Sequence, residues 1–181
     1  MWIKKAYKFL RKDSWLSLII SLFLAFLFVK FMFYPIIEYS FGTPFPIVAV
    51  VSSSMEHNDF FDGWWDKNYE EYSFSKEEFQ SFDFSSGFNK GDIMIIFKKD
   101  VNIGDVLVYQ KPAQITYLPN YPIIHRVIAV GSEGYITKGD NNENPDTYPV
   151  SESAVLGIAI ARVPLLGWIK IGFTYLIGFL V

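Results

Sequence analysis

The stretch IIHRVIAVGSEGYITKGD, residues 123–140, decides the fold of this chain. Residues 123–130 and 135–138 are rich in Val and Ile, which are typical of β-strands. Between them, Gly131-Ser132-Glu133-Gly134 supplies the residue types of a turn. The stretch therefore predicts two neighbouring antiparallel strands, followed by a sharp Lys-Gly-Asp turn.

Similar short apolar runs lie on both sides of this stretch. They are bounded by Gly, Pro, Asn and Asp, and no long amphipathic helix competes with them. Further strands are predicted at residues 47–52, 93–97, 106–110 and 155–162. The fold class expected from this pattern is mostly β, an antiparallel and partly barrel-like β domain over residues 38–162.

An apolar segment precedes this domain. The run from Trp15 to Ile37 carries one charge, Lys30, and a membrane span needs about 20 apolar residues. A basic group precedes the run, so the positive-inside rule predicts a cytoplasmic N-terminus for residues 1–14 and an extracytoplasmic domain after the anchor. A cleaved signal peptide is the alternative, but the run is too long and no clean small-x-small site follows it. The basic residues are Lys4, Lys5, Lys8, Arg11 and Lys12.

The last residues, 163–181, form a second hydrophobic segment with Lys170 near its middle. Three interpretations remain open for it. It is a short second membrane span, an interfacial helix with Trp168 and Tyr175 at headgroup depth, or a terminal strand.

Residues 56–89 form an acidic, aromatic insert between the first two predicted strands. The insert contains nine acidic and eleven aromatic residues. Because disordered segments usually lack aromatics, we expect the insert to fold or to dock on the domain. Ser75, followed by Glu77 and Glu78, predicts the start of a short helix. Trp64 and Trp65 are expected to cover the core, with the membrane interface as the alternative.

Composition limits the function classes. The 181 residues suit one domain plus a membrane segment, since 51% are hydrophobic and 19% are charged. The net charge of −3 argues against a nucleic-acid partner. The absence of cysteine excludes disulfides and cysteine-based metal sites.

Ser54 is the first candidate for chemistry, at the end of the serine-rich run Val50–Ser54. A serine hydroxyl needs a base to become a nucleophile, and the chain offers only two histidines. His57 lies in a polar stretch and is expected at the surface. His125 lies in an otherwise apolar strand, where a structural role is the alternative to a catalytic one.

Two carboxylates, Asp140 and Asp146, follow the last strand of the opening stretch. Both lie in one tight loop, so both could approach one imidazole, and one of them would orient the ring. One alternative is a turn that needs Asp, Asn and Gly only for its backbone. Another is a calcium loop with alternating oxygen ligands at positions 140, 142, 144 and 146, although the glycine and distal glutamate of an EF-hand loop are missing. A hydroxyl, an imidazole and a carboxylate together indicate a nucleophilic hydrolase.

Five segments in order resemble signal peptidase I, in its archaeal and endoplasmic-reticulum branch. Each is weak alone, but the set covers roughly residues 47–160 behind an N-terminal anchor. The segments are Val50–Glu56, Gly91–Ile93, Gly104–Tyr109, Ile124–Ile128, and Thr137–Asn142 with Asp146.

The resemblance implies a role for each candidate residue. Ser54 would be the nucleophile and His125 the base, at the position where the bacterial branch has a lysine. Asp146 would be the catalytic aspartate, with Asp140 as a supporting acid. The Ser52 side chain would form the oxyanion hole with the Ser54 N–H.

This sequence departs from the family pattern in three places. Ser53 stands where glycine is usual, His57 replaces a frequent proline, and the insert is longer than the usual link. These departures concern the loop around Ser54 and its contacts with substrate.

The resemblance also implies an activity and partners. It predicts a membrane-bound serine endopeptidase, which removes N-terminal signal peptides from exported preproteins at the cell membrane. Its substrates would carry small residues at the first and third positions before the cut. Membrane lipid is an expected partner and the protein-export channel a possible one, whereas no cofactor, metal ion or nucleic acid is expected.

Two other functions stay open at this point. One is a non-catalytic, membrane-anchored β module that binds a peptide or partner through its aromatic insert. The other is a membrane-tethered Ser-His protease with a regulatory substrate.

Overall fold

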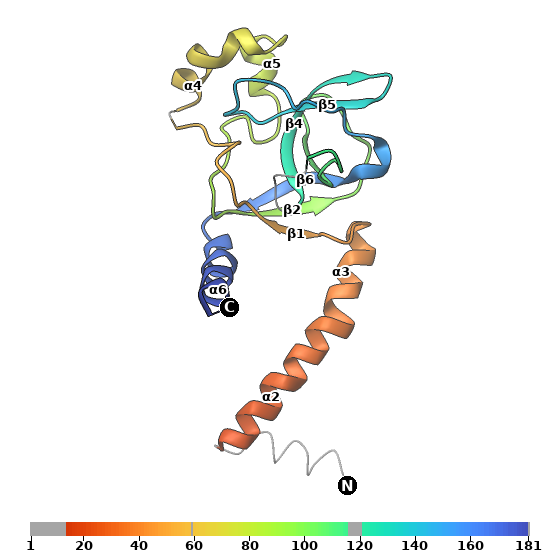
Figure 1. Cartoon of the computed structure of the whole chain (residues 1–181), viewed down its shortest axis with the longest axis vertical. Helices are drawn as coiled ribbons and strands as arrows, with labels where there is room; N and C mark the ends of the chain where they lie inside the picture. Colours follow the sequence, from red (N-terminus) through yellow and green to blue (C-terminus); the bar gives the residue numbers. More distant parts are fainter. Residues whose placement is uncertain (1–13, 59, 116–120, 181) are drawn as a thin grey trace. The chain divides into compact units, whose positions relative to one another are not determined.

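The computed structural model describes residues 14–58, 60–115 and 121–180. The chain divides into two compact units, Met1–Ser40 and Phe41–Val181 (Figure 1). The basic residues expected in the cytoplasm lie at positions 1–13, outside the described residues. Their placement therefore stays a prediction.

The described part of the first unit is one helical run, whose last residue is the first of the second unit. It consists of α2 (Trp15–Phe28), a π-helical turn (Val29–Phe33) and α3 (Tyr34–Phe41). At about 1.5 Å per residue, the 27 residues of the run extend about 40 Å, more than the roughly 30 Å of a bilayer core. Of the described helices, it alone is long and apolar enough to cross a membrane. The expected anchor segment is therefore an apolar helix.

Two local features of this run involve backbone hydrogen bonds. It begins at Ser14, whose hydroxyl accepts a hydrogen bond from the Ser17 N–H at 3.2 Å. The π-helical turn precedes Pro35, which has no N–H to donate. There the Tyr34 N–H bonds to the Val29 carbonyl five residues back, the spacing of a π-helix.

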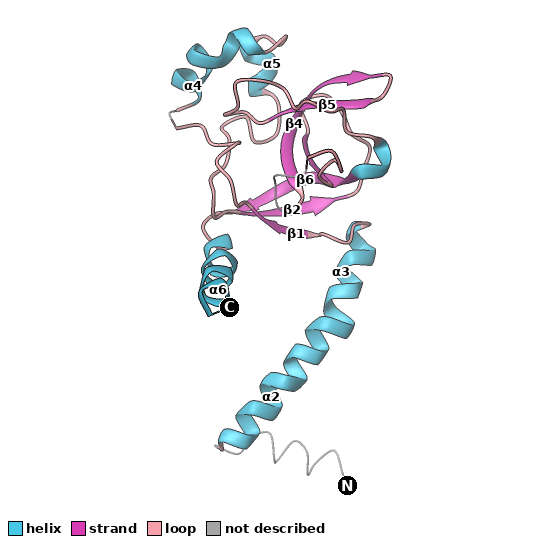
Figure 2. Cartoon of the chain, in the orientation of Figure 1, coloured by secondary structure: helices cyan, strands magenta, loops and turns pink. Residues whose placement is uncertain are grey.

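The second unit contains a six-stranded antiparallel sheet, which confirms the expected fold class (Figure 2). The strand order is β1-β2-β6-β3-β4-β5, so β1 and β5 form the edges. The predicted first strand is too long, because residues 50–55 leave the sheet and form the loop that carries Ser54. The strands are β1 (Ile47–Ala49), β2 (Ile93–Phe97), β3 (Val106–Tyr109), β4 (Ile123–Gly131), β5 (Gly134–Lys138) and β6 (Val155–Val163).

The predicted hairpin between β4 and β5 is confirmed. Gly131 pairs with Gly134 at its turn, and Arg126 pairs with Lys138 further along. Gly134 has a φ of +133°, and a Cβ there would lie 2.2 Å from the Val150 carbonyl oxygen. Only glycine fits this close approach.

The sheet buries side chains on both faces of its inner strands. All four residues of β3 are buried. Val106 and Val108 belong to one apolar cluster, and Leu107 and Tyr109 belong to another, because neighbouring side chains of a strand point to opposite faces. Tyr109 is thus a core residue on the face that also carries the site described below.

The insert is folded within the second unit, as expected. It forms α4 (Phe61–Asn68), a 3₁₀ turn (Tyr69–Glu71) and α5 (Lys76–Gln80). The Ser75 hydroxyl caps α5 by accepting a hydrogen bond from the Glu78 N–H at 3.1 Å, which confirms the predicted helix start. Trp64 and Trp65 are 3% and 7% exposed and pack in a third apolar cluster, so they cover the core.

The C-terminal segment forms a helix, α6 (Gly167–Leu180), after β6 ends at Val163. The terminal-strand interpretation is therefore wrong for residues 167–180. The 14 residues of α6 extend about 21 Å, short of a full bilayer core. Apolar side chains such as Ile169 and Phe173 are exposed on it, and its contact with a membrane stays a prediction.

Candidate active site

The Ser54 loop leaves β1 and is attached to two neighbouring segments. Val50 exchanges backbone hydrogen bonds with residues 91 and 92, each 2.9 Å long. The Ser54 carbonyl accepts a hydrogen bond from the Asn141 N–H at 2.8 Å. Ser54 therefore has a defined backbone position beside the 139–142 turn.

The structure brings Ser54, His125 and Asp146 together. His125 lies in β4 opposite Leu107 of β3 and is 8% exposed. Its Nε2 lies 3.1 Å from the Ser54 Oγ, and its Nδ1 lies 2.6 Å from the Asp146 Oδ2. With Nδ1–H donating to the carboxylate, Nε2 is free to accept the serine proton.

Two further side chains contact the Asp146 carboxylate. The Oδ2 atom also accepts hydrogen bonds from the Tyr109 hydroxyl at 2.7 Å and the Thr137 hydroxyl at 2.6 Å. Burial tends to raise the pKa of Asp146, but the hydrogen bond and charge of His125, with the two hydroxyls, lower it below its usual range. Asp146 is thus ionised and fixed in orientation.

Sequence reasoning missed Tyr109 and Thr137. Both lie at the ends of segments that carry the family resemblance, but neither residue type alone indicates a catalytic neighbour. The alternation of β3 predicts that Tyr109 shares a face with Leu107, and its buried hydroxyl needs a partner. The alternation is readable from the sequence, whereas the burial of the Tyr109 hydroxyl is seen only in the structure.

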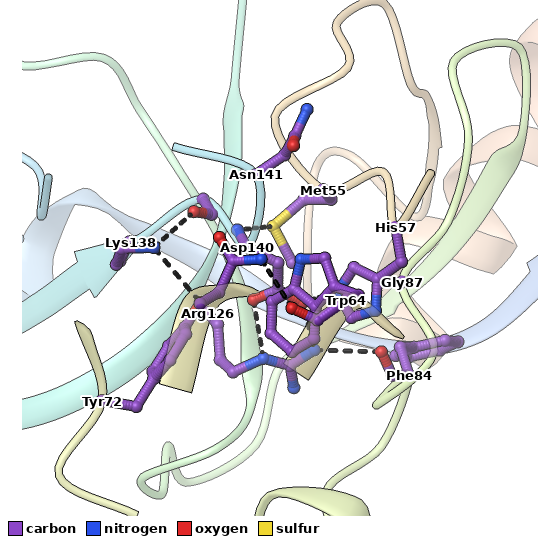
Figure 3. A network of polar contacts seen from close by, with 12 residues as sticks. Met55, His57, Trp64, Tyr72, Phe84, Gly87, Arg126, Lys138, Asp140 and Asn141 are labelled. Atoms are coloured by element: carbon purple, nitrogen blue, oxygen red, sulfur yellow. Dashed lines mark hydrogen bonds and ion pairs between the residues drawn. The ribbon is translucent and has the colours of Figure 1, made fainter. Parts of the chain in front are cut away.

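Asp140 lies in a different network from Asp146, and Figure 3 shows the network around Asp140. Its carboxylate accepts hydrogen bonds from Arg126 Nε at 2.9 Å and Nη2 at 2.7 Å, and His57 Nε2 lies 3.1 Å away. Burial tends to raise the pKa of Asp140, but the Arg126 charge and the His57 hydrogen bond hold it below its usual range. The two loop carboxylates therefore contact two different imidazoles.

The surface position predicted for His57 is wrong. Its side chain is fully buried, and its ring stacks on Trp64 with centroids 3.7 Å apart. The insert folds back over the 139–142 turn and covers the imidazole. A polar local sequence did not reveal this burial, because the covering residue lies seven positions along the chain.

Ser52 lies next to Ser54 in the same exposed stretch. The two hydroxyl oxygens are 3.2 Å apart. This distance allows the Ser52 hydroxyl to donate a hydrogen bond to an oxygen atom near the Ser54 Oγ.

A cavity of about 440 Å³ opens beside the Ser54 hydroxyl. It is lined by residues 49–52, 121–125, 142 and 144–148, among others, so it contacts Ser54, His125 and Asp146 together. Among the described residues, no group of three His, Cys, Asp or Glu side chains is arranged to bind a metal ion. The site offers a hydroxyl, an imidazole and a carboxylate at the edge of an open cavity.

Several proteins that are similar to this chain are named as signal peptidase complex catalytic subunits. No protein-family model matches the chain. The signal peptidase complex catalytic subunit sec11 of Schizosaccharomyces pombe is 34% identical over 144 residues, which cover 71% of this chain and 67% of that protein. This chain belongs to the family of signal peptidase catalytic subunits.

Other signal peptidase relatives are more distant. The SEC11 subunit of Yarrowia lipolytica is 26% identical over 156 residues, which cover 78% of this chain and 71% of that protein. The subunit of Colletotrichum graminicola is 25% identical over 144 residues, and this chain spans 64% of that protein, just under two thirds. The signal peptidase resemblance drawn from the five segments is confirmed.

Proposed function

We propose that this chain is a membrane-bound serine endopeptidase, which removes N-terminal signal peptides from exported preproteins. The observation that carries the proposal is the pair of short contacts that link Ser54 to His125 and His125 to Asp146, in a chain that belongs to the signal peptidase family. Ser54 Oγ lies 3.1 Å from His125 Nε2, and His125 Nδ1 lies 2.6 Å from Asp146. Family membership supplies the reaction, and these distances support the residues that perform it.

The reaction begins when His125 accepts the Ser54 proton and Ser54 Oγ attacks the scissile carbonyl carbon. The negative charge on the carbonyl oxygen is stabilised by the Ser52 hydroxyl and the Ser54 N–H. His125 then donates its proton to the leaving amine, and the C–N bond breaks. Water, deprotonated by His125, hydrolyses the acyl ester and restores the Ser54 hydroxyl.

Asp146 stabilises the imidazolium that forms in each half of the reaction. Its ionised carboxylate faces His125 Nδ1 and fixes the ring so that Nε2 points to Ser54. The two ring nitrogens of His125 contact Asp146 and Ser54, not Asp140. We therefore assign Asp140 a supporting role in the adjacent turn.

The substrate would bind as an extended chain beside Ser54. The strand order leaves one edge of β1 without a neighbour in the sheet, so a substrate strand can pair there before it reaches the 50–55 loop. The family resemblance supplies the preference for small residues at the first and third positions before the cut. The cavity at Ser54 is where those side chains would enter.

The arrangement at the membrane follows the charge pattern. Residues 15–37 are the proposed transmembrane anchor, with residues 1–14 in the cytoplasm and the catalytic domain on the extracytoplasmic side of the cell membrane. Residues 163–181 would contact the same membrane. Because relatives are named as subunits of a signal peptidase complex, further subunits and the export channel are candidate partners.

The insert does not favour the non-catalytic binding module. Most of its large aromatics pack in their own buried cluster and leave little surface for a partner; the exceptions include Phe60 and Tyr69. A membrane protease with a regulatory substrate would use the same site, and only mapping of its products separates it from a signal peptidase.

The test is cleavage of a model preprotein by the full-length chain in detergent, with the cut site mapped by mass spectrometry. We expect Ser54→Ala to lower the rate by about three orders of magnitude or more. Ser53→Ala, in the same exposed loop, is the matched control and should keep most of the activity. A Ser54→Ala variant that cleaves at the wild-type rate would refute the proposal.

A further inference from the structure

The Ser54 loop depends on the 139–142 turn for its position. The Asn141 N–H donates to the Ser54 carbonyl at 2.8 Å, and the Asn141 side-chain amide donates to the Ser53 carbonyl at 3.1 Å. Gly139 lies so close that a Cβ on it would be 2.8 Å from the Ser54 carbonyl oxygen. A shift of this turn would therefore move Ser54 relative to His125.

Asp140 fixes the turn through Arg126. The guanidinium gives two N–H groups to the Asp140 carboxylate and the other three to carbonyls of Asp83, Phe84 and Gly104, at 2.8 to 3.0 Å. Both side chains are 0% exposed. Two of these carbonyls, at Asp83 and Phe84, belong to the insert.

His57 connects the start of the insert to the same carboxylate. Because Asp140 is an ionised acceptor, the His57 Nε2 carries the proton and donates across 3.1 Å. The ring has an indole on one side: Trp64 stacks on it with an interplanar angle of 5°. Gly87 lies against the ring as well, since a Cβ there would be 2.6 Å from His57 Cδ2. The imidazole therefore has little freedom to leave Asp140.

The insert also contacts the other end of the turn. Lys138, which precedes Gly139, is 0% exposed and lies 2.6 Å from the Glu71 carboxylate. Its ammonium donates to the Tyr72 hydroxyl at 3.3 Å and lies 4.7 Å from the Tyr72 ring centre. Figure 3 shows His57, Trp64 and Tyr72 meeting Asp140, Arg126 and Lys138 in one buried group.

We infer that the insert is a positioning element of the active site, in which His57 and Trp64 hold the Asp140 turn and through it the Ser54 loop. The inference rests on the proposed function, since it assigns the insert a role in orienting the nucleophile. His57 and Trp64 touch no reacting atom, so they are positioning residues. The long insert and His57 are both departures from the family pattern. In this inference they have the same role, which is to position the Ser54 loop.

The experiment compares His57→Leu, His57→Gln and Trp64→Leu with wild type, as full-length chains in detergent. We expect His57→Leu and Trp64→Leu to lower kcat by 10-fold to 100-fold, with KM nearly unchanged, because misplaced reacting groups lose rate. His57→Gln keeps a donor near the Nε2 position and should restore much of the loss. Phe60→Ala, 93% exposed at the edge of the insert, is the control and should match wild type.

Hydrogen exchange provides a readout that does not need activity. The amides of Glu56 and Asn141 bond to Ser53 and Ser54, so their exchange reports the loop and turn directly. We expect faster exchange of both in His57→Leu and unchanged exchange in Phe60→Ala. Where His57→Leu fails to fold, Trp64→Phe, which keeps a smaller ring over the imidazole, should give a graded increase.

The outcomes separate the two proposals. Wild-type kcat and wild-type exchange in His57→Leu would overturn the positioning role. A wild-type chain that does not cleave the preprotein in a Ser54-dependent way would overturn the proposed function, and exchange alone would then decide whether the insert orders the loop.

Discussion

At the scale of single residues, one carboxylate oxygen of the site has three hydrogen-bond partners. Asp146 Oδ2 lies within hydrogen-bond distance of His125 Nδ1 and accepts hydrogen bonds from the hydroxyls of Tyr109 and Thr137. Hydrogen bonds to a charged acceptor contribute about 1.5–3 kcal/mol each, so these hydroxyls stabilise the ionised carboxylate that faces the imidazole.

The first prediction concerns Tyr109. Tyr109→Phe removes one hydroxyl from Asp146 without emptying the core, because the ring stays. We expect kcat for the preprotein to fall about 10-fold, with KM nearly unchanged, because the carboxylate that faces the imidazolium loses one of the hydrogen bonds that orient it. Tyr39→Phe, at a position that is 90% exposed, is the control. Equal kcat values for Tyr109→Phe and wild type would contradict this role.

The second prediction concerns Asp140 and pH. Because its pKa is lowered in the folded chain, the unfolded chain binds more protons below about pH 4, and the stability from the Asp140 charge is lost as pH falls through the folded pKa. Above about pH 4 that stability is fully present. Asp140→Asn leaves Arg126 without its counter-charge and should cost about 3–5 kcal/mol at neutral pH.

The measurement for Asp140 is denaturant unfolding of both chains in detergent from pH 7 to pH 3. The difference between wild type and Asp140→Asn should be largest above about pH 4 and shrink below it. A difference that stays constant across this range would contradict a charged, paired Asp140.

The order of the sequence segments indicated which residues would come together. Ser54, His125 and Asp146 lie in recognisable segments and are close in space, while their catalytic roles stay a prediction. The surface position predicted for His57 is wrong because its burial depends on stacking with Trp64, a contact that the local sequence does not indicate. Residue type and spacing alone do not separate Asp140 from Asp146, since six residues of loop allow either to face a given imidazole; only the family resemblance assigns them different roles.

At the scale of elements, the 139–142 turn bonds directly to the Ser54 loop. The third prediction is that Gly139→Ala impairs catalysis, because its Cβ would meet the Ser54 carbonyl at 2.8 Å and the Asn142 side chain at 2.7 Å. We expect kcat to fall at least 10-fold while the fold is retained. Gly172→Ala is the matched control, since nothing lies within 4 Å of a Cβ there. Equal cleavage by Gly139→Ala and Gly172→Ala would contradict this role of the turn.

The elements themselves were largely predictable, but their neighbours were not. Runs of Val and Ile located each strand, and Ser75 with two glutamates located the start of α5. The sheet order was not readable, because β6 pairs with β2 and β3 across long stretches of chain and periodicity carries no information about such partners. The C-terminal segment stayed ambiguous because a short apolar run suits a helix or a strand equally.

At the scale of the whole molecule, the proposed function requires the catalytic domain on one side of a membrane and the N-terminus on the other. The chain has no cysteine, so single cysteines report topology without interference. The fourth prediction is that Ser151→Cys is labelled by an impermeant maleimide in intact cells, whereas Ser14→Cys is labelled only after the membrane is opened. Labelling of Ser14→Cys alone in intact cells would reverse the proposed orientation.

The central claim is that Ser54 and His125 act as one catalytic unit, and a double-substitution comparison tests it most directly. The measurement is kcat/KM for preprotein cleavage by wild type, Ser54→Ala, His125→Ala and the double variant. Groups that act together give non-additive losses, so we predict that each single change costs about three orders of magnitude or more and that the double change costs little beyond either. Losses that multiply in the double variant, or a His125→Ala chain with wild-type kcat/KM, would contradict the account.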